Sequence, residues 1–269
     1  MTPPDSPDTA SDTAPGPAHG SPASPHRVHR PDLEADLQRS GGVSVTVSGP
    51  EAHHALRVKR LREGDAVELF DGAGRTLASV YTSWRGSRQN PAMVLEPAGE
   101  VVLAEPVSPR VEVFCPPPRA ERLGPMIDQL SQIGAAAWVP LATARTQGSA
   151  NDFKRDKLDR VVVESAKQCR RAWLMEIGEP VWFEQAIGLE GAVLFDVSGR
   201  AGPASGAGGV ARLFVGPEGG WTADELDIAG QAGVATRRAG AHTLRLETAA
   251  VVAATTALHD ARPDQRGPA

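Results

Sequence analysis

The sequence predicts an α/β protein with two folded domains, a small β-rich domain of barrel type and a larger domain with a mostly parallel sheet. In residues 43–103, apolar and polar residues alternate in short runs such as VSVTV and AVELF, which is typical of strands. Beyond a proline-bounded linker at residues 106–109, apolar runs alternate with helical patterns, which is typical of a parallel sheet covered by helices. Residues 1–26 are mainly Pro, Ser, Ala, Thr, Gly and Asp and predict a disordered tail. We therefore expect domains at residues 27–104 and 108–262.

The elements of the β-rich domain follow one another closely. Alternation with period two predicts strands at residues 43–47, 66–70 and 76–82. The sequence Asp-Gly-Ala-Gly at residues 71–74 predicts the hairpin turn between the last two of these strands. One short helix is expected at residues 50–62.

In the second domain, predicted strands alternate with predicted helices. Strands are predicted at residues 111–115, 137–141, 192–196, 212–216 and 233–237. Helices are predicted at residues 125–133, 153–171, 222–232 and 247–260. Gly134 is the expected stop of the first helix, because glycine readily adopts the left-handed conformation of a helix C-cap.

Composition and charge exclude several classes of protein. The chain has 269 residues, of which 41% are hydrophobic and 23% charged, as in a soluble globular protein. No apolar run reaches the roughly 18 residues of a membrane helix, and the N-terminus has no secretory pattern. Two cysteines, Cys115 and Cys169, make no disulfide framework, so we expect a cytoplasmic protein. The net charge is −5, but residues 1–26 hold three aspartates and no Lys or Arg, which leaves −5 + 3 = −2 for the rest and permits basic patches.

The first candidate for a ligand site is the stretch GPEGG at residues 216–220, between an apolar strand and a helix start. Glycines let main-chain N–H and C=O groups approach a ligand where a Cβ atom would clash. Thr222, followed three residues later by Glu225, predicts a capping box. The spacing matches no phosphate-binding motif, and Glu218 would repel an anion, so a cationic ligand such as a sulfonium is favoured. An ordinary tight turn before a helix is the alternative.

The second candidate is AGAHTLRLETAA at residues 239–250, which again places a glycine-containing loop before a helix. If the segment is extended, Thr243, Arg245 and Glu247 share one face. Small residues follow at helical spacing and permit close packing of the main chain. A surface ion pair between Arg245 and Glu247 is the alternative.

Two basic clusters favour a polyanionic partner such as RNA. The first lies on the short predicted helix, where Arg57 and Arg60 are expected to share a face. It consists of His53, His54, Arg57, Lys59, Arg60 and Arg62. The second is KQCRR at residues 167–171, which contains no acidic residue. In the first half of that long helix acidic residues interleave, and a solvated face is the alternative there. The histidines are scattered, so no metal site is expected.

With both glycine loops identified, the chain resembles the small-subunit (16S) ribosomal RNA uracil-N3 methyltransferases of the SPOUT trefoil-knot superfamily. The resemblance covers about residues 43–260 and depends most on VGPEGG at 215–220 and LRLETA at 244–249. Supporting matches lie at residues 49–54, 62–65, 140–141 with Arg145, and 164–171. The chain departs from the usual family pattern at Asp128, Gln129, Gln132 and His242.

The resemblance implies a PUA-like barrel followed by an α/β domain in which the chain threads a loop to form a knot. It implies S-adenosylmethionine as the cofactor, bound in a pocket formed by the two glycine loops. The cofactor-binding residues would be Val215, Gly216, Pro217, Glu218, Gly219, Gly220, Gly240, Thr243, Leu244 and Thr248. The catalytic residues would be Arg245, which stabilises charge on the uracil oxygens, and Glu247 or Glu218, which orients Arg245 or helps with the proton.

The resemblance also implies a homodimer that acts on 16S ribosomal RNA or the small ribosomal subunit, without a membrane or a metal. The residues expected to bind RNA are His54, Arg57, Arg60, Arg145, Gln168 and Arg171. Two alternatives remain open at this point. One is a SPOUT methyltransferase that acts on another RNA position, and the other is an RNA-binding or ribosome-assembly protein that has lost catalysis.

Overall fold

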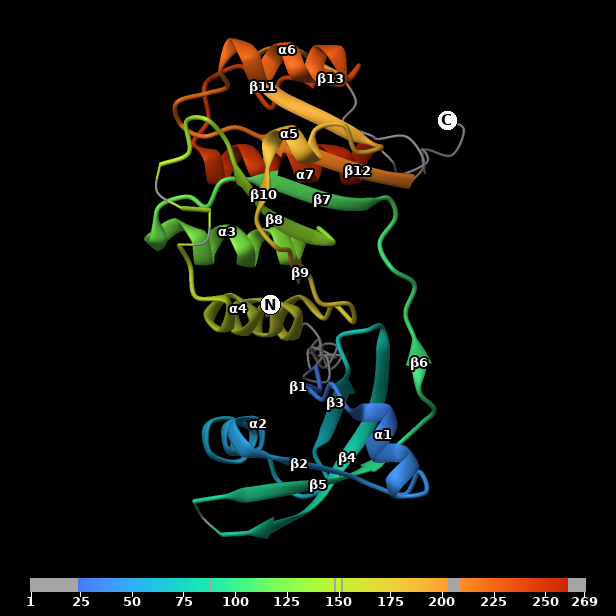
Figure 1. Cartoon of the computed structure of the whole chain (residues 1–269). Coiled ribbons are helices and arrows are strands. Elements are labelled where there is room, and N and C mark those ends of the chain that lie inside the picture. The colour runs from blue at the N-terminus through green and yellow to red at the C-terminus, as the bar shows by residue number, and fades with distance from the viewer. Residues whose placement is uncertain (1–23, 88, 148, 151, 203–208, 261–269) are drawn as a thin grey trace, which may run out of the picture.

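The computed structural model describes residues 24–87, 89–147, 149–150, 152–202 and 209–260, and places them around two separate sheets (Figure 1). Most of the predicted tail, residues 1–23, lies outside the described residues. Its last residue, His26, is not part of a disordered tail. It begins strand β1 (His26–His29), which pairs in parallel with β3 (Ala66–Phe70). The tail prediction was wrong at this point because the pairing partner lies far away in the sequence.

The first sheet is a curled half-barrel (Figure 1). Its strand order is β1-β3-β4-β5-β2, with β6 paired to β4. Besides β1 and β3, its strands are β2 (Val45–Ser48), β4 (Arg75–Gly86), β5 (Pro91–Pro97) and β6 (Val102–Leu103). The pairs β3–β4, β4–β5 and β2–β5 are antiparallel, and apolar residues on one face of the sheet form a core around Val47, Leu69 and Met93. A domain of barrel type is therefore confirmed, with its sheet open between β1 and β2 in the described residues.

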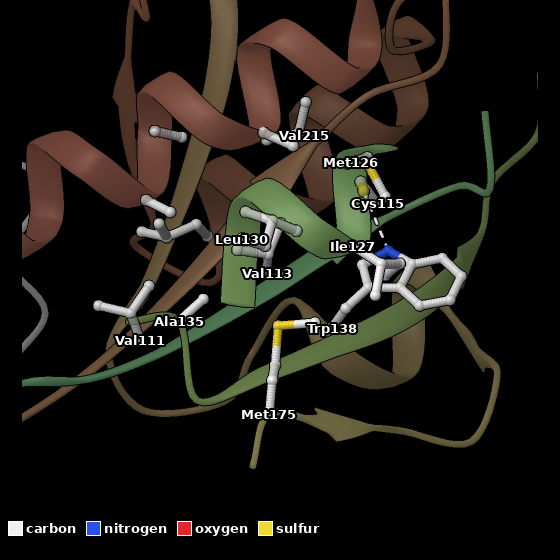
Figure 2. Close-up of a cluster of buried hydrophobic side chains, with 14 of the residues drawn as sticks. Val111, Val113, Cys115, Met126, Ile127, Leu130, Ala135, Trp138, Met175 and Val215 are labelled. Atoms are coloured by element: carbon white, nitrogen blue, oxygen red, sulfur yellow. Dashed lines mark hydrogen bonds between the residues drawn. The ribbon is translucent and has the colours of Figure 1, made fainter. Parts of the chain in front are cut away.

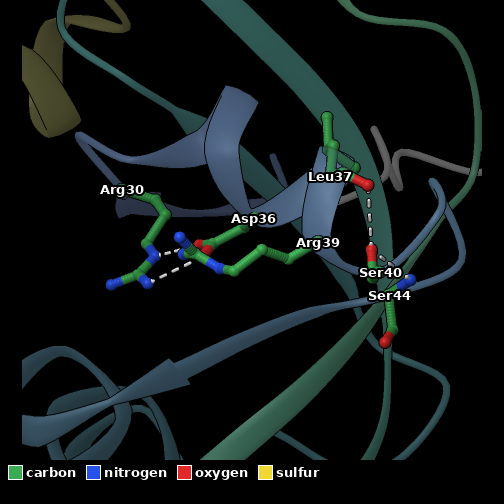
Figure 3. A network of polar contacts seen from close by, with 6 residues as sticks. All are labelled: Arg30, Asp36, Leu37, Arg39, Ser40 and Ser44. Atoms are coloured by element: carbon green, nitrogen blue, oxygen red, sulfur yellow. Dashed lines mark hydrogen bonds and ion pairs between the residues drawn. The ribbon is translucent and has the colours of Figure 1, made fainter.

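A helix that the sequence analysis did not predict, α1 (Leu33–Arg39), covers this sheet and is fixed by a buried carboxylate. Asp36 accepts hydrogen bonds from Arg30 and Arg39, and Ser40 closes the helix by donating to the Leu37 carbonyl at 3.2 Å (Figure 3). Burial alone would raise the pKa of Asp36, but the two guanidinium groups outweigh it and lower that pKa.

The helix predicted at residues 50–62 ends earlier than expected, at Val58, and changes from an α-helix to a π-helix along its length. It consists of α2 (Gly49–His53) and one π-helical turn, η1 (His54–Val58), in which the Lys59 N–H donates to the His54 carbonyl at 3.0 Å. Arg60 follows with a positive φ of 57°. The prediction that Arg57 and Arg60 share a helical face is therefore wrong, because the chain has left the helix before Arg60.

The second sheet is parallel throughout its described pairs, as predicted. Its strand order is β10-β8-β7-β12-β11-β13, with β9 paired to β8. The strands are β7 (Arg110–Cys115), β8 (Ala137–Ala142), β9 (Glu176–Ile177), β10 (Val181–Trp182), β11 (Ala192–Arg200), β12 (Val210–Val215) and β13 (Ala235–Arg237). The short strands β9 and β10 were not predicted.

Helices cover both faces of this sheet (Figure 1). They are α3 (Ala120–Ile133), α4 (Arg155–Cys169), α5 (Phe183–Ala186), α6 (Ala223–Gln231) and α7 (Leu246–Asp260). The predicted helices are all present, although α3 begins at Ala120 and carries Pro125 inside it. Gly134 ends α3 in the left-handed conformation, with a φ of 102°, as expected. Among the described residues, no helix combines the length and apolar character needed to cross a membrane.

The side chains of β7 point alternately to the two faces of the sheet, and one of these faces packs under α3 and α7. Val111, Val113 and Cys115 face these helices, whereas Phe114 belongs to the core on the opposite face (Figure 2). The indole N–H of Trp138 donates to the Cys115 sulfur at 3.2 Å. Burial raises the pKa of the Cys115 thiol to about 12, so this cysteine is a core residue rather than a nucleophile.

The small-residue face of α7 packs as the sequence predicts. Ala250, Ala253, Ala254 and Ala257 are completely buried against the sheet and α3. Alanine allows the helix axis to approach its neighbours closely. This packing fixes the first turn of α7, and with it the segment before Leu246, next to the ends of β11 and β12.

Candidate functional site

A pocket of about 300 Å³ lies where the carboxyl ends of β11 and β12 meet the segment before α7. We call it the strand-end pocket. Ligands bind at this edge of open parallel sheets because the loops that leave neighbouring strands diverge there. It is lined by Phe195, Asp196, Val197, Val215, Gly216, Pro217, Glu218, Gly219, Gly220, Trp221, Arg238, Ala239, Gly240, His242, Thr243, Leu244, Leu246 and Ala249. The structure thus brings the two predicted glycine loops together around one cavity.

The first loop is shaped by two glycines. A Cβ atom on Gly216 would lie 2.9 Å from the Trp221 ring, so only glycine fits without displacing the indole. Gly220 has a φ of 68°, a conformation that side chains disfavour. Trp221 is itself held, because it is 6% exposed and its indole N–H donates to the Phe195 carbonyl at 2.9 Å. The loop therefore presents main-chain atoms to the pocket in a fixed shape.

A buried glutamate anchors the helix after this loop. The predicted capping box at Thr222 is present, and the Glu225 carboxylate accepts from the Thr222 N–H at 2.8 Å. The other carboxylate oxygen accepts from the Ala144 N–H at 2.9 Å. Glu225 is only 2% exposed, and it therefore ties α6 to the loop that follows β8. The capping box was predicted from the sequence, whereas the bond to Ala144 was not.

Arg145, which we expected to bind RNA, contacts the glycine loop. One guanidinium nitrogen donates to the Gly219 carbonyl at 2.7 Å and to the Trp221 carbonyl at 3.1 Å. Arg145 thus holds the carbonyl groups of the loop, and Glu225 holds the main-chain N–H groups of Thr222 and Ala144 next to it. Its position supports the shape of the pocket, and its contact with RNA stays a prediction.

The second loop differs from the sequence prediction. Gly240, Thr243 and Leu244 line the strand-end pocket, but Arg245 and Thr248 are not among its lining residues. The segment is not extended as far as Glu247, because α7 already begins at Leu246 and the Ala249 N–H donates to the Arg245 carbonyl at 2.8 Å. Arg245 is exposed immediately before the helix. The expectation of one shared polar face was therefore wrong.

Glu247 pairs with a residue that the sequence analysis did not single out. Its carboxylate lies 3.4 Å from the Arg122 guanidinium in the first turns of α3. The second carboxylate oxygen is buried and has no hydrogen-bond partner among the described residues. The alternative prediction paired Glu247 with Arg245, but in the structure Arg122 is the partner of Glu247.

Of the RNA-binding candidates, His54 and Gln168 lie in a groove of about 800 Å³ between the half-barrel and α4. We call it the junction groove. It is lined by Ser24, Pro25, His26, Arg27, His54, Lys59, Leu61, Asp65, Ala66, Glu164, Lys167, Gln168 and Arg170. Arg57 and Arg171 are not among these residues. Arg171 points to α3 and donates to the Ser131 carbonyl at 3.0 Å, and burial lowers its pKa.

Charged side chains hold the two sides of the junction groove together. Lys167 of α4 lies 2.7 Å from Glu51 of α2 and 2.8 Å from Glu164. Burial lowers the pKa of Lys167, but its hydrogen bonds to these two carboxylates outweigh burial and raise it. Arg27 of β1 pairs with Glu68 at 2.6 Å and donates to the Ala166 carbonyl at 2.6 Å. Strand β1 is therefore part of the contact between the half-barrel and α4.

His26 lies in the same groove and is held neutral. Its ring stacks on His54 with 6.1 Å between the centroids. Burial lowers the pKa of His26 to about 4, and the positive charges of Lys167 and Lys59 and the neighbouring His54 add to this effect. Among the described residues, no group of three or more His, Cys, Asp or Glu side chains is arranged to hold a metal ion.

Sequence reasoning missed two residues that line the strand-end pocket and one that pairs with Glu247. Asp196 follows directly after the buried part of β11 and lines the pocket. Because neighbouring parallel strands end at the same edge of a sheet, its position in the sequence could have predicted that it lies beside the glycine loop. Trp221 adjoins the glycines, but the sequence analysis assigned it no role. Arg122 gave no signal, because its partner Glu247 lies far away in the sequence.

The fold and the pocket together define a two-domain protein that binds a small ligand at the strand ends of its α/β domain, next to a half-barrel. The sequence identifies the family. Residues 105–258 match the RNA methyltransferase domain, and residues 47–77 match the RNA methyltransferase PUA domain. The chain belongs to this RNA methyltransferase family.

Curated relatives agree with this assignment. The chain is 30% identical over 227 residues to ribosomal RNA small subunit methyltransferase E of Synechocystis sp., an alignment that covers 78% of this chain and 71% of the relative. It is 33% identical over 232 residues to the protein of the same name in Mycobacterium bovis, covering 81% of this chain and 86% of the relative. The resemblance stated from the two glycine loops is therefore confirmed.

Solved structures share the fold. A probable rRNA-methyltransferase from Porphyromonas gingivalis superimposes with a TM-score of 0.74 at 24% identity, covering 88% of this chain and 99% of that chain. Ribosomal RNA small subunit methyltransferase E from Neisseria gonorrhoeae, solved bound to S-adenosyl methionine, gives a TM-score of 0.70 at 21% identity, covering 88% of this chain and 97% of that chain. These likenesses confirm the predicted fold, a half-barrel domain followed by an α/β domain, and the family models identify the two as the PUA and methyltransferase domains.

Proposed function

We propose that this protein transfers a methyl group from S-adenosylmethionine to N3 of a uracil in 16S ribosomal RNA. The observation that carries the proposal is the strand-end pocket, in which the glycine loops that follow β12 and β13 close over one cavity at the end of β11. The curated relatives bear the name of a small-subunit ribosomal RNA methyltransferase, and this favours the proposal over the two alternatives.

The strand-end pocket has the size and the chemistry for this cofactor. Its volume of about 300 Å³ is within the range of small-molecule sites. Its wall near Gly216 has no room for a Cβ atom, so main-chain groups can lie directly against a ligand. Its lining residues include the acidic Asp196 and Glu218 and one arginine, Arg238, and this excess of acidic residues favours a ligand that carries positive charge.

When bound, S-adenosylmethionine supplies a methyl group already activated by its positive sulfur. The task left to the protein is to hold uracil N3 in line with that group and to stabilise charge as the N3 proton is lost. We assign charge stabilisation on the uracil oxygens to Arg245, which is exposed beside the pocket and therefore accessible to a base. We assign the N3 proton to Glu247 or Glu218. Arg122 holds Glu247 in position and leaves one of its oxygens unpaired among the described residues.

The proposal includes the partners. The target base must leave its stack to reach the pocket, and the RNA around it would contact His54, Gln168 and the neighbouring cations of the junction groove. We further propose that the protein works as a homodimer in the cytoplasm.

The first test is mass spectrometry of nucleosides from small-subunit ribosomal RNA of cells with and without this gene. We expect 3-methyluridine to disappear on deletion and to return when the gene is restored. An unchanged level of 3-methyluridine would overturn the assignment of the modified base.

The role of Arg245 is tested with Arg245→Ala. We expect the rate constant of methyl transfer to fall about 10²- to 10³-fold, the usual effect of removing a group that stabilises transition-state charge. The dissociation constant of S-adenosylmethionine should stay near that of the wild type, because Arg245 does not line the strand-end pocket. The matched variant is Arg245→Lys, which keeps the charge and should recover part of the rate. An equal loss of cofactor binding and rate would show that Arg245 acts on the pocket instead.

A further inference from the structure

Trp84 lies at an unusual place on the half-barrel. Along β4 the residues Leu77, Ser79 and Tyr81 are buried on the core face, and a bulge after Tyr81 keeps Trp84 on that same face, opposite the buried Met93. The core ends before Trp84, however, and this indole is 48% exposed. A large aromatic side chain thus continues the row of core residues into solvent.

The exposed indole forms one wall of a pocket of about 250 Å³, which we call the Trp84 pocket. Its other lining residues are Leu56, Arg57 and Pro91. They come from the π-helical turn η1 and from the start of β5, beside the projecting end of the β4–β5 hairpin (Figure 1). The pocket is shallow and mainly apolar, with one guanidinium at its edge.

The surroundings of the Trp84 pocket are basic. Residues 52–62, AHHALRVKRLR, contain four Lys and Arg residues and no acidic residue. Arg85, next to the indole, is also exposed. An aromatic face surrounded by cations complements a nucleotide, whose base is flat and apolar on its faces and whose phosphate is negative. An acidic peptide matches the cations but offers a flat apolar face only where it carries a residue such as Phe or Pro, whereas every nucleotide of a single strand carries a base.

We propose that the Trp84 pocket binds an unpaired base of the RNA substrate by stacking it on the Trp84 indole, with the adjoining phosphates on the basic residues of the turn. This inference rests on the proposed function, since it takes RNA as the substrate. It adds a contact with a single-stranded nucleotide, at a place far from the strand-end pocket.

The turn η1 connects this contact to the junction groove. His54 and Lys59 line the junction groove, whereas Leu56 and Arg57 line the Trp84 pocket. One short segment therefore supplies residues to both places. A single RNA strand that crosses the turn has cations along its path and an aromatic platform at one end.

The test is the affinity of the full-length protein for a fluorescein-labelled single-stranded oligouridylate of about ten nucleotides, measured by fluorescence anisotropy. Trp84→Ala should raise the dissociation constant about 5- to 100-fold, the range found for one base–aromatic stack. Trp84→Phe keeps an aromatic face and should stay within about threefold of the wild type. Trp182→Ala removes another exposed tryptophan, 58% exposed in the second domain, and should leave the affinity unchanged.

The outcomes separate this inference from the proposed function. If Trp84→Ala binds the single strand as tightly as the wild type, or loses affinity for a blunt RNA duplex equally, base stacking on Trp84 is wrong. If Trp84→Ala binds free RNA normally but loses methyl transfer on assembled ribosomal subunits, the pocket contacts a protein, and the inference is also overturned. Methyl transfer by the wild type is measured separately, so a failure of the proposed reaction leaves the binding result interpretable.

Discussion

The strand-end pocket is bordered by two glycine-containing loops, whereas the junction groove is bordered by side chains that form ion pairs between α4 and the half-barrel. In the first, Gly216 and Gly220 set the shape, and Trp221, Glu225 and Arg145 hold it from outside. In the second, the shape depends on ion pairs of α4 with the half-barrel. Because of this difference, we expect the two sites to be sensitive to opposite kinds of substitution. Adding a single atom should damage the pocket, and removing a charge should damage the groove.

The largest effect is expected for Gly216→Ala. The new Cβ atom would lie 2.9 Å from the Trp221 ring, which is buried and hydrogen-bonded and therefore cannot move without cost. Overpacking of this kind costs about 1–3 kcal/mol, and the free loop relieves it by leaving its present shape. Restoring that shape on binding S-adenosylmethionine should lower the affinity by about 5- to 150-fold. Isothermal titration calorimetry measures the dissociation constant.

Gly230→Ala provides the matched control for this variant. Gly230 lies inside α6, and a Cβ atom placed there meets nothing within 4 Å. Alanine is also the better helix former, so cofactor affinity should be unchanged and stability slightly higher. Equal affinities for the two variants would contradict a pocket shaped by the close approach of Gly216.

An intermediate effect is expected for Lys167→Met, which should act on stability and not on the pocket. The substitution leaves the Glu51 carboxylate without its cation, although Glu51 is largely covered by the junction. Loss of one partner from a partly buried pair should lower the free energy of unfolding by about 1–3 kcal/mol. Chemical denaturation measures this change, and calorimetry should show unaltered binding of S-adenosylmethionine.

Lys157→Met, at an exposed position of the same helix, is the control and should stay within about 0.5 kcal/mol of the wild type. If Lys167→Met and Lys157→Met had the same free energy of unfolding, the ion pairs of the junction would not be what joins the two domains.

The smallest effect is a pH dependence from His26. The folded protein keeps this imidazole neutral down to a pKa of about 4, whereas the unfolded chain takes up the proton near pH 6.5. Stability is therefore unaffected above pH 6.5 and is lost as the pH falls from 6.5 towards 4. Because the ring is only partly buried, we expect a loss of about 1–2 kcal/mol.

His26→Gln removes the titrating group. The variant should lose less unfolding free energy than the wild type between about pH 7 and pH 4.5, as measured by denaturation at each pH. Identical slopes for the two proteins would show that the groove admits the protonated ring without cost.

The same contrast explains how much the sequence could predict. The strand-end pocket was predictable because its parts are local patterns, namely VGPEGG at 215–220, a capping box and a loop before an alanine-rich helix. The junction was not, because it depends on pairs such as Arg27 with Glu68 and Lys167 with Glu51, which no periodicity relates. The same reason hid β1, whose partner strand β3 follows after two helices, a strand and the turn η1.

Within the pocket, the role of single residues was the weakest part of the prediction. Arg245 and Glu247 were placed on one strand-like face, but the first turn of α7 separates them and Arg122 takes the carboxylate. Arg145 was assigned to RNA although it holds two carbonyls of the glycine loop. The assignments of Arg245, Glu247 and Glu218 to catalysis, and the domain boundaries at 27–104 and 108–262, stay predictions.

The π-helical turn η1 has a consequence for which changes of chain length the half-barrel tolerates. A π turn holds one residue more than an α turn, so deleting one residue between His54 and Val58 would allow α2 to continue as an ordinary helix. The α turn would then close over the same span of chain, so residues beyond Val58 would keep their positions and only side chains within the turn would shift around the helix axis. The half-barrel should therefore tolerate the loss of one residue here, and the change would fall on His54 in the junction groove and on Leu56 and Arg57 in the Trp84 pocket.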